Sequence, residues 1–314
     1  MLSLADGYLA ERRRLGFDLK IPGTQVRAFA RFADDAGHVG PLTTRIVLDW
    51  VKGKARNANA LSWARRLDLL RPLAAYLKRL DPATEFPVGA IFGRSHRRLT
   101  PHIYTDQEIV DLLAAARRLP PSGTLRPATY ETLFGLIAAT GLRVSEALHL
   151  RCGDVDIEGQ RLTIRMTKFR KSRHVPIHAT VAAALTRYMA VRARYATIGT
   201  DAALLLSQSG TQLPSGTVHH VFRHLRTELG YVARGAHGQV RIHDLRHTFI
   251  CRRVRLWHEH GADIDNAIAA LSTYVGHAKV SDTYWYLTGV PELMAIAGRR
   301  FEDFAADVGE AAHG

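Results

Sequence analysis

One segment combines a histidine and an arginine at a spacing that suits phosphate chemistry. His243, Arg246 and His247 stand at positions i, i+3 and i+4 of a predicted helix over 243–257, so they share one helix face. His243 on that face can act as a general acid, a general base or a hydrogen-bond donor to a phosphate oxygen. The same segment has the HxxxH spacing of a zinc helix, with Asp244 where zinc hydrolases use glutamate. Because Arg246 would place a cation beside the metal, zinc is the weaker alternative.

A second candidate phosphate ligand, Arg143, lies in an otherwise apolar stretch over 133–148. A guanidinium stays charged and offers paired planar donors, which suits the non-bridging oxygens of a phosphodiester. Burying it in such a stretch is costly unless an anion accompanies it. Glu146, three residues later, can orient the Arg143 guanidinium.

Two further segments carry groups with possible roles in catalysis. Lys168 and Lys171 lie at the tip of a predicted hairpin, between alternating stretches at 161–167 and 173–178. A lysine there can protonate a departing oxygen, although such tips are usually only solvated. Farther along, Val275-Gly276-His277 is followed nine residues later by Tyr286, with Tyr284 as the competing tyrosine. A phenol has a pKa of about 10, so as a nucleophile it needs nearby cations and a base.

Taken in chain order, these segments resemble the tyrosine recombinase, or phage integrase, family, in its Xer-like form. The resemblance rests on Thr140-Gly-Leu-Arg-Val-Ser-Glu-Ala-Leu148, the hairpin lysine, His243-Asp-Leu-Arg-His-Thr-Phe249, and Val275-Gly-His277 with Tyr286. It covers roughly residues 105–290. It implies a catalytic set of Arg143, Lys168, His243, Arg246, His277 and Tyr286, with Glu146 in support. The family usually has leucine where this chain has Val275, and His247 is common in the motif without being catalytic, so we expect it to serve in packing.

The resemblance also implies an activity, namely site-specific DNA recombination of the integrase or transposon type. Tyr286 would form a 3′-phosphotyrosyl bond and release a 5′-hydroxyl, and a partner strand would then reseal the backbone. One ester replaces another, so neither metal, nucleotide nor other cofactor is expected. The implied partners are double-stranded DNA and a homotetramer on synapsed DNA, with a monomer or dimer off DNA and accessory or partner recombinases in addition.

Three alternatives remain open at this point. A type IB topoisomerase-like enzyme would use the same chemistry to relax DNA. A non-catalytic DNA-binding protein would keep the fold but would have no need for the whole catalytic set. A zinc hydrolase is the alternative from a different class.

The composition favours a polyanionic partner. The 314 residues carry 43 Lys and Arg against 29 Asp and Glu, and the first 104 residues hold 18 of the former and 9 of the latter. Lys and Arg near phosphates release condensed counterions, although arginine used merely for solubility is the alternative. Two distant cysteines, Cys152 and Cys251, exclude a disulfide framework. No apolar run approaches the roughly 20 residues of a membrane span, and the basic-then-apolar order of a signal peptide is missing. We therefore expect a cytoplasmic, nucleoid-associated protein.

The elements that must position these residues are mainly helical, with a small β-hairpin (α+β). We expect a helical, core-binding domain over 1–93, a basic linker over 94–104, a catalytic domain over 105–300 and a tail over 301–314. By resemblance, the two domains form a C-shaped clamp on DNA and the tail docks on a neighbouring subunit. Pro22 and Gly23 are expected to separate the first two helices. A short helix through 51 is expected to begin after Thr43 or Thr44, and a longer one through 80 after Asn57 or Asn59. The other predicted helices cover 2–15, 25–36, 106–119, 129–139, 179–193, 217–229 and 264–274.

Overall fold

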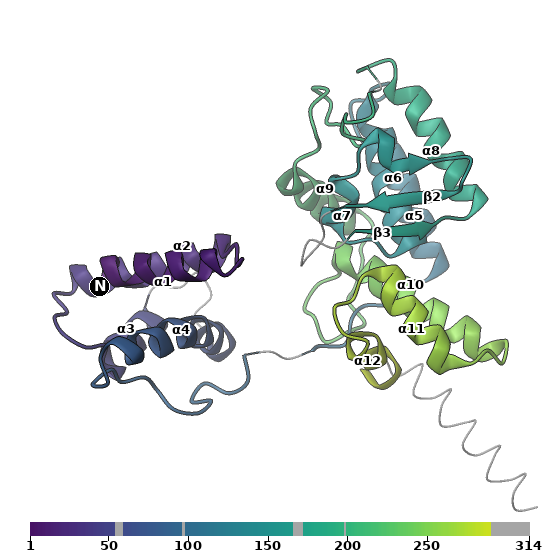
Figure 1. Ribbon diagram of the computed structural model, residues 1–314. Helices are drawn as coiled ribbons and strands as arrows, with labels where there is room; N and C mark the ends of the chain where they lie inside the picture. Colours follow the sequence, from purple (N-terminus) through teal and green to yellow (C-terminus); the bar gives the residue numbers. More distant parts are fainter. Residues whose placement is uncertain (54–58, 96–97, 166–171, 198, 290–314) are drawn as a thin grey trace, which may run out of the picture. The chain divides into compact units, whose positions relative to one another are not determined.

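The computed structural model describes residues 1–53, 59–95, 98–165, 172–197 and 199–289. The chain divides into two compact units, Met1–Arg98 and Leu99–Gly314, which are drawn in Figure 1. The predicted linker over 94–104 spans this boundary. Each unit has its own hydrophobic core.

The N-terminal unit is helical throughout its described elements. These are α1 (Leu2–Arg14), α2 (Lys20–Asp35), α3 (Thr44–Lys52) and α4 (Ala60–Leu80). Thr43 caps α3 by accepting from the backbone N–H of Ile46. Asn59 and Ser62 cap α4 reciprocally through side chain and backbone. Apolar residues from all four helices, including Leu9, Phe29, Val47 and Leu73, are fully buried between them.

The boundary between the first two helices differs from the prediction. Pro22 and Gly23 lie inside α2, which begins at Lys20. The first-turn N–H groups of a helix have no intrahelical acceptor, so a proline there removes no hydrogen bond. Gly23 is buried, and a Cβ on it would lie 3.5 Å from Leu9 of α1. That distance is an ordinary van der Waals contact, so the packing of α2 on α1 would also accommodate an alanine at this position.

The second unit packs helices around a long apolar helix and a small sheet. Its first elements are α5 (Asp106–Arg117), α6 (Leu125–Thr140), α7 (Val144–Leu148) and a short 3-10 helix, η1 (Cys152–Asp154). Then come β1 (Val155–Asp156), β2 (Arg161–Ile164), β3 (Arg173–Pro176), α8 (Ala179–Arg192) and α9 (Ser215–Glu228). The last are α10 (Ile242–Glu259), α11 (Ile264–Val275) and α12 (Ser281–Gly289). Helix α6 contacts α5, α8 and α10, which makes it the centre of this core.

The three strands form one antiparallel sheet in the order β1-β2-β3. The predicted hairpin is confirmed, with Leu162 opposite Val175, both fully buried, whereas β1 is an addition to the prediction. The hairpin tip, with Lys168 and Lys171, lies outside the described residues. The mainly helical fold with a small sheet is as predicted.

The described part of the chain has neither a membrane-spanning helix nor a disulfide. No helix there is both long and apolar enough to cross a bilayer. Cys152 and Cys251 are both buried, and neither forms a disulfide with another described residue.

Candidate active site

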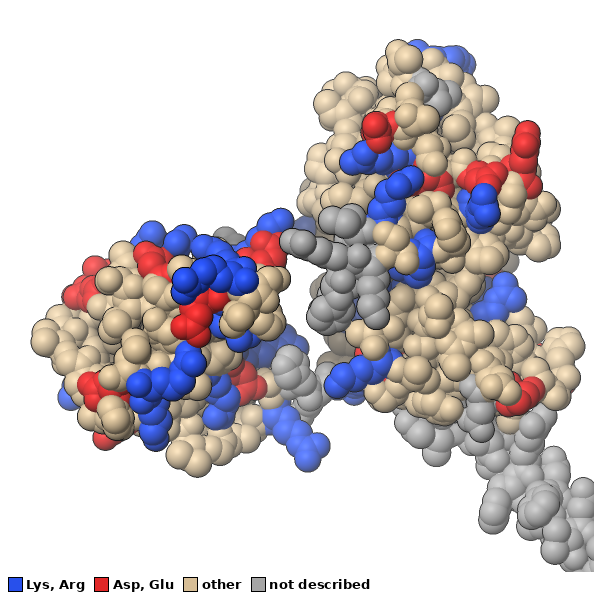
Figure 2. All heavy atoms as spheres, in the orientation of Figure 1, with Lys and Arg blue, Asp and Glu red and all other residues tan. Residues whose placement is uncertain are grey.

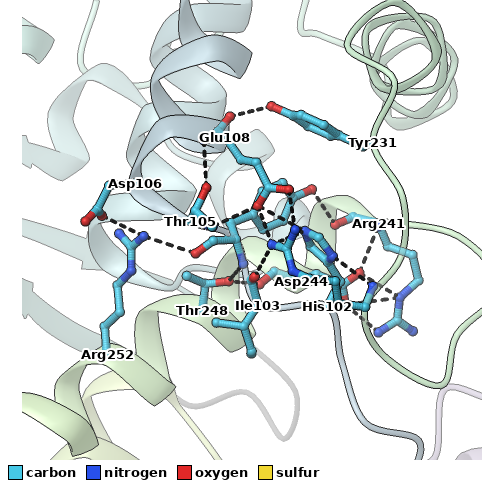
Figure 3. Close-up of polar contacts among 12 residues, drawn as sticks. His102, Ile103, Thr105, Asp106, Glu108, Tyr231, Arg241, Asp244, Thr248 and Arg252 are labelled. Carbon is cyan, nitrogen blue, oxygen red and sulfur yellow. Dashed lines mark hydrogen bonds and ion pairs between the residues drawn. The ribbon is translucent and has the colours of Figure 1, made fainter. Parts of the chain in front are cut away.

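A buried polar network fixes helix α10 along one face, as Figure 3 shows. The side chain of Asp244 is fully buried and accepts from the backbone N–H of Arg241 at 2.8 Å and from its Nη2 at 2.6 Å. One turn later, Thr248 Oγ1 accepts from the backbone N–H of Tyr104 at 2.9 Å. After another turn, Arg252 Nη2 donates to the carbonyl of Tyr104 at 3.1 Å. The face with Asp244, Thr248 and Arg252 is therefore anchored, which leaves the opposite face for chemistry.

The same network ties the segment before α5 to the loop before α10. His102 is buried, with Nε2 3.4 Å from Glu108, whose carboxylate also binds Arg234 at 2.8 Å. Burial and then the charge of Arg234 lower the pKa of His102. The hydroxyl of Tyr231 donates to the carbonyl of Glu108. These contacts hold the start of α10 in place.

We expect Asp244→Ala to lower the free energy of unfolding by about 2 kcal/mol, because it removes a helix cap and the acceptor of the Arg241 backbone N–H and guanidinium. Urea denaturation of the full chain measures this. Asp201→Ala is the control, since Asp201 pairs with Arg151 while 87% exposed, and its loss should stay within about 0.5 kcal/mol. Equal losses for both variants would show that Asp244 does not anchor α10.

Arg246 lies on α10 with 1% of its side chain exposed. Its Nη1 donates to the carbonyl of Gly141 at 2.6 Å and its Nη2 to that of Val275 at 2.8 Å. Burial, and then the charge of Arg143, lower the pKa of Arg246 to about 10. The guanidinium remains charged at neutral pH, so a buried positive charge stands at the point where α6, α10 and α11 meet.

Arg143 and Glu146 form an ion pair across the first turn of α7. Arg143 Nη1 donates to Glu146 Oε1 at 2.8 Å, and its backbone N–H donates to Oε2 at 3.0 Å. Arg143 Nη2 reaches the carbonyl of Gly276 at 2.9 Å. Glu146 is 6% exposed, whereas Arg143 keeps 32% exposure. Arg143 thus has an orienting partner, as its spacing from Glu146 suggested, and an exposed edge for a ligand.

A third arginine, which the sequence did not single out, completes this cluster. Arg173 of β3 donates from Nη1 and Nη2 to the two carboxylate oxygens of Glu146, both at 3.0 Å. Burial alone would raise the pKa of Glu146, but the hydrogen bond from Arg173, a backbone hydrogen bond from Arg143 and both charges lower it. Glu146 therefore stays ionised. No pattern in the sequence marks Arg173, because its role depends on β3 lying beside α7 and α11.

Tyr286 is buried with 3% exposure, and its hydroxyl lies 2.6 Å from His247 Nδ1. Tyr284, by contrast, is 39% exposed. Burial and then the neighbouring His243 lower the pKa of His247 to about 2, so its ring is neutral. His247 was expected to serve only in packing, and the polar contact with Tyr286 corrects that expectation. Its place on the face of His243 and Arg246 was the signal that pointed to it.

The other two histidines stand on either side of this tyrosine contact. The ring of His277 stacks on that of Tyr286 at 6.3 Å, and its Nδ1 lies 2.7 Å from the hydroxyl of Thr283. His243 packs edge-on against His247 at 4.7 Å. Surrounding protein, and then the charge of Arg246, lower the pKa of His243 to about 4, although part of the side chain reaches solvent. A bound anion next to His243 would favour its protonated form.

The structure therefore brings together every predicted site residue that it describes. Lys168, the predicted acid, and its alternative Lys171 lie outside the described residues. In the part of the chain that is described, no three His, Cys, Asp or Glu side chains gather as a possible metal site, so the HxxxH segment has no third ligand there. Beside Arg143 and His243 opens a hollow of about 630 Å³, whose lining also includes His219, Arg223, Arg226 and Arg241. With its arginines and histidines, this hollow can hold an anion next to Arg143 and His243.

Comparison with known proteins agrees with this geometry. The Phage integrase family model matches residues 103–290. A putative integrase/recombinase, y4rB of Sinorhizobium fredii, is 40% identical over 304 residues, which cover 94% of this chain and 95% of the relative. Tyrosine recombinase XerD of Neisseria meningitidis serogroup B is 29% identical over 76% of this chain and 74% of its own.

Solved structures share the fold at low sequence identity. XerH site-specific recombinase bound to its palindromic difH substrate has a TM-score of 0.62 at 17% identity, with 90% of this chain and 78% of that chain covered. The Tn1549 transposon integrase in complex with a circular intermediate DNA has a TM-score of 0.64 at 16% identity, with 90% and 94% covered. The extent of the family match and the similarity to y4rB along nearly the whole chain show that this chain belongs to the phage integrase family of tyrosine recombinases.

Proposed function

We propose that this recombinase cleaves and rejoins double-stranded DNA at specific sites with Tyr286 as the nucleophile. Tyr286 passes its phenolic proton to His243 as its oxygen attacks the scissile phosphorus, the bond from phosphorus to the 5′ oxygen breaks, and a 3′-phosphotyrosyl ester forms. Lys168 protonates the departing 5′ oxygen. A 5′-hydroxyl of the partner strand then attacks the ester, which frees Tyr286 and reseals the backbone. The observation that supports this assignment most is the contact of the Tyr286 hydroxyl with His247.

The charges around this tyrosine suit each step. Arg143 and Arg246 stabilise the negative charge that spreads over the non-bridging oxygens. Arg246 is fixed by two backbone carbonyls, and Arg143 keeps an exposed edge. His243 and His277 complete the phosphate site, with His243 able to exchange a proton once the phosphate raises its pKa.

His247 is assigned the task of holding the Tyr286 hydroxyl for in-line attack. A ring with so low a pKa is a poor proton acceptor, but the unprotonated nitrogen of a neutral imidazole can still accept a hydrogen bond. We expect His247→Phe to slow formation of the covalent adduct by about 10- to 100-fold, and His247→Asn, which retains an acceptor, to slow it less. Single-turnover cleavage measures both. Wild-type rates in His247→Phe would exclude this role.

The proposed partners are double-stranded DNA and further copies of this chain, which form a tetramer on synapsed sites. The unit Met1–Arg98 is proposed to be the core-binding half of a clamp on that DNA. The relatives' own descriptions include DNA-bound recombinases and a transposon integrase. The basic excess is largest in this unit, and Figure 2 shows several groups of Lys and Arg on the face of it that is drawn, with acidic residues among them. Recombination of a mobile element in the bacterial cytoplasm and nucleoid is the proposed setting. The tail over 301–314, proposed to dock on a neighbouring subunit, lies outside the described residues.

The test of this function uses duplex DNA from the regions that flank the gene. A strand nicked near the crossover cannot religate once it is cleaved, so a covalent adduct accumulates on a denaturing gel. We expect an adduct in the presence of EDTA, and exchange between two plasmids that carry the same site. Relaxation of supercoiled DNA without exchange would favour a topoisomerase. Salt-sensitive DNA binding without an adduct would favour a non-catalytic binding protein, and an activity that EDTA abolishes would favour a metal enzyme.

A further inference from the structure

Three arginines from separate parts of the chain hold the end of helix α11. The carbonyls of three successive residues, 274–276, each accept one guanidinium N–H. The donors are Arg173 Nε at 2.8 Å, Arg246 Nη2 at 2.8 Å and Arg143 Nη2 at 2.9 Å. The last carbonyls of a helix lack intrahelical donors and carry the negative end of its dipole. The cations therefore stabilise the turn that leads directly into His277.

The same three guanidiniums surround one carboxylate, that of Glu146. Arg173 binds both of its oxygens at 3.0 Å, and Arg143 binds one at 2.8 Å. Arg246 Nη1 lies 4.0 Å from the other. Three positive charges and one negative charge leave the cluster with a net charge of +2. Every member is partly or wholly withdrawn from water, so a change of one charge has a large effect on an anion held there.

Arg173 is placed differently from its two companions. Its side chain is only 11% exposed, and all three of its nitrogens already pair with Glu146 or with the carbonyl of Tyr274. It also lies against the backbone of Gly276, where a Cβ would come within 2.6 Å of its Nη1. Gly276 has a φ of +69°, which favours glycine as well. Arg173 thus supports the site from behind and leaves the exposed edge to Arg143.

We propose that Arg173 is a positioning residue for strand cleavage, which acts through Glu146 and the end of α11. By neutralising Glu146, it leaves the charges of Arg143 and Arg246 available to the scissile phosphate. By binding the carbonyl of Tyr274, it fixes the turn from which His277 and then α12 with Tyr286 follow. This inference rests on the proposed function of Tyr286.

The charge of the cluster separates this role from a purely structural one. Arg173→Met lowers the net charge to about +1 and leaves Glu146 to compete with the phosphate for the two remaining arginines. Glu146→Gln in the same chain removes that competitor and returns the charge to about +2. A residue that merely supported the fold would show no such recovery, because the second change removes a further buried contact.

The experiment measures two quantities for the full-length wild type, Arg173→Met, Glu146→Gln and the double variant. These are single-turnover formation of the adduct on nicked duplex DNA and the affinity for the same DNA. We expect Arg173→Met to slow adduct formation about 100-fold while DNA affinity changes by less than about threefold, since the residue contacts no phosphate. The double variant is expected to form the adduct at least about tenfold faster than Arg173→Met. Arg161→Met is the matched control from the same sheet, because Arg161 pairs with Asp156 while 56% exposed, and it should cleave as the wild type does.

Two results would overturn the inference, namely an unaffected Arg173→Met or a double variant no faster than it. Should Arg173→Met fail to fold by circular dichroism, Arg173→Lys replaces it. The lysine loses the planar fork but keeps the charge next to Glu146, so it should slow adduct formation by no more than about tenfold. A folded Arg173→Lys that is inactive therefore also contradicts the proposal. A wild type without any adduct would overturn the proposed function and this inference with it, whereas a normal wild type beside an unaffected Arg173→Met overturns the inference alone.

Discussion

Replacing Tyr286 by phenylalanine is expected to abolish the covalent protein–DNA adduct while leaving the affinity for DNA unchanged. The substitution removes one hydroxyl from a buried ring, and with it the only atom of that side chain that can attack phosphorus. Loss of an essential nucleophile lowers turnover by more than about 10⁴-fold. The ring still stacks on His277, so the fold should persist. Cleavage of nicked duplex DNA, with binding measured in parallel, tests this.

Tyr284→Phe is the matched control, because it removes the same atom two residues away. Tyr284 is 39% exposed, whereas Tyr286 is 3% exposed and its hydroxyl contacts His247. We expect this variant to form adduct at the wild-type rate. If Tyr284→Phe lost the adduct and Tyr286→Phe kept it, the nucleophile would be Tyr284 and the assignment to Tyr286 would be wrong.

Arg246→Lys is expected to have the second-largest effect, slowing adduct formation by about 100- to 1,000-fold. The charge is conserved, so the salt dependence of DNA binding should stay the same. A lysine has no planar fork and cannot hold the carbonyls of Gly141 and Val275 while it also faces a phosphate. Its ammonium is also more strongly hydrated, which makes burial at this position costly.

The control for Arg246→Lys lies on the same helix. Arg255 is 51% exposed and pairs with Glu259 one turn later, so Arg255→Lys should leave both cleavage and stability nearly unchanged. Adduct formation by Arg246→Lys at the wild-type rate would mean that the planar fork of Arg246 has no part in cleavage.

Local spacing predicted the parts of this site that lie within one helix. His243, Arg246 and His247 share a face because a helix repeats every 3.6 residues. Arg143 and Glu146 meet for the same reason, across a single turn. The helical class of the fold and the hairpin could be predicted as well, because their apolar periodicities differ.

Contacts between elements distant in sequence could not be predicted in this way. Arg173 reaches Glu146 only because β3 lies beside α7, and no periodicity carries that information. The contact of His247 with Tyr286 likewise depends on how α12 packs against α10. A helix was expected to begin near His277, but its bounds were not predicted, because its aromatic run has no clear apolar stripe and its packing on α10 and α11 stabilises it. The start of α2 was predicted too late because a proline in the first turn of a helix and a proline between two helices look the same in sequence.

The most direct test of the central claim is to locate the DNA on the protein. The adduct formed on nicked duplex DNA is digested with nuclease and protease, and fragmentation mass spectrometry then assigns the remaining nucleotide to one residue. The account predicts a 3′-phosphotyrosyl linkage at Tyr286 in the presence of EDTA. A nucleotide on Tyr284, on any other side chain, or joined through its 5′ phosphate would contradict it.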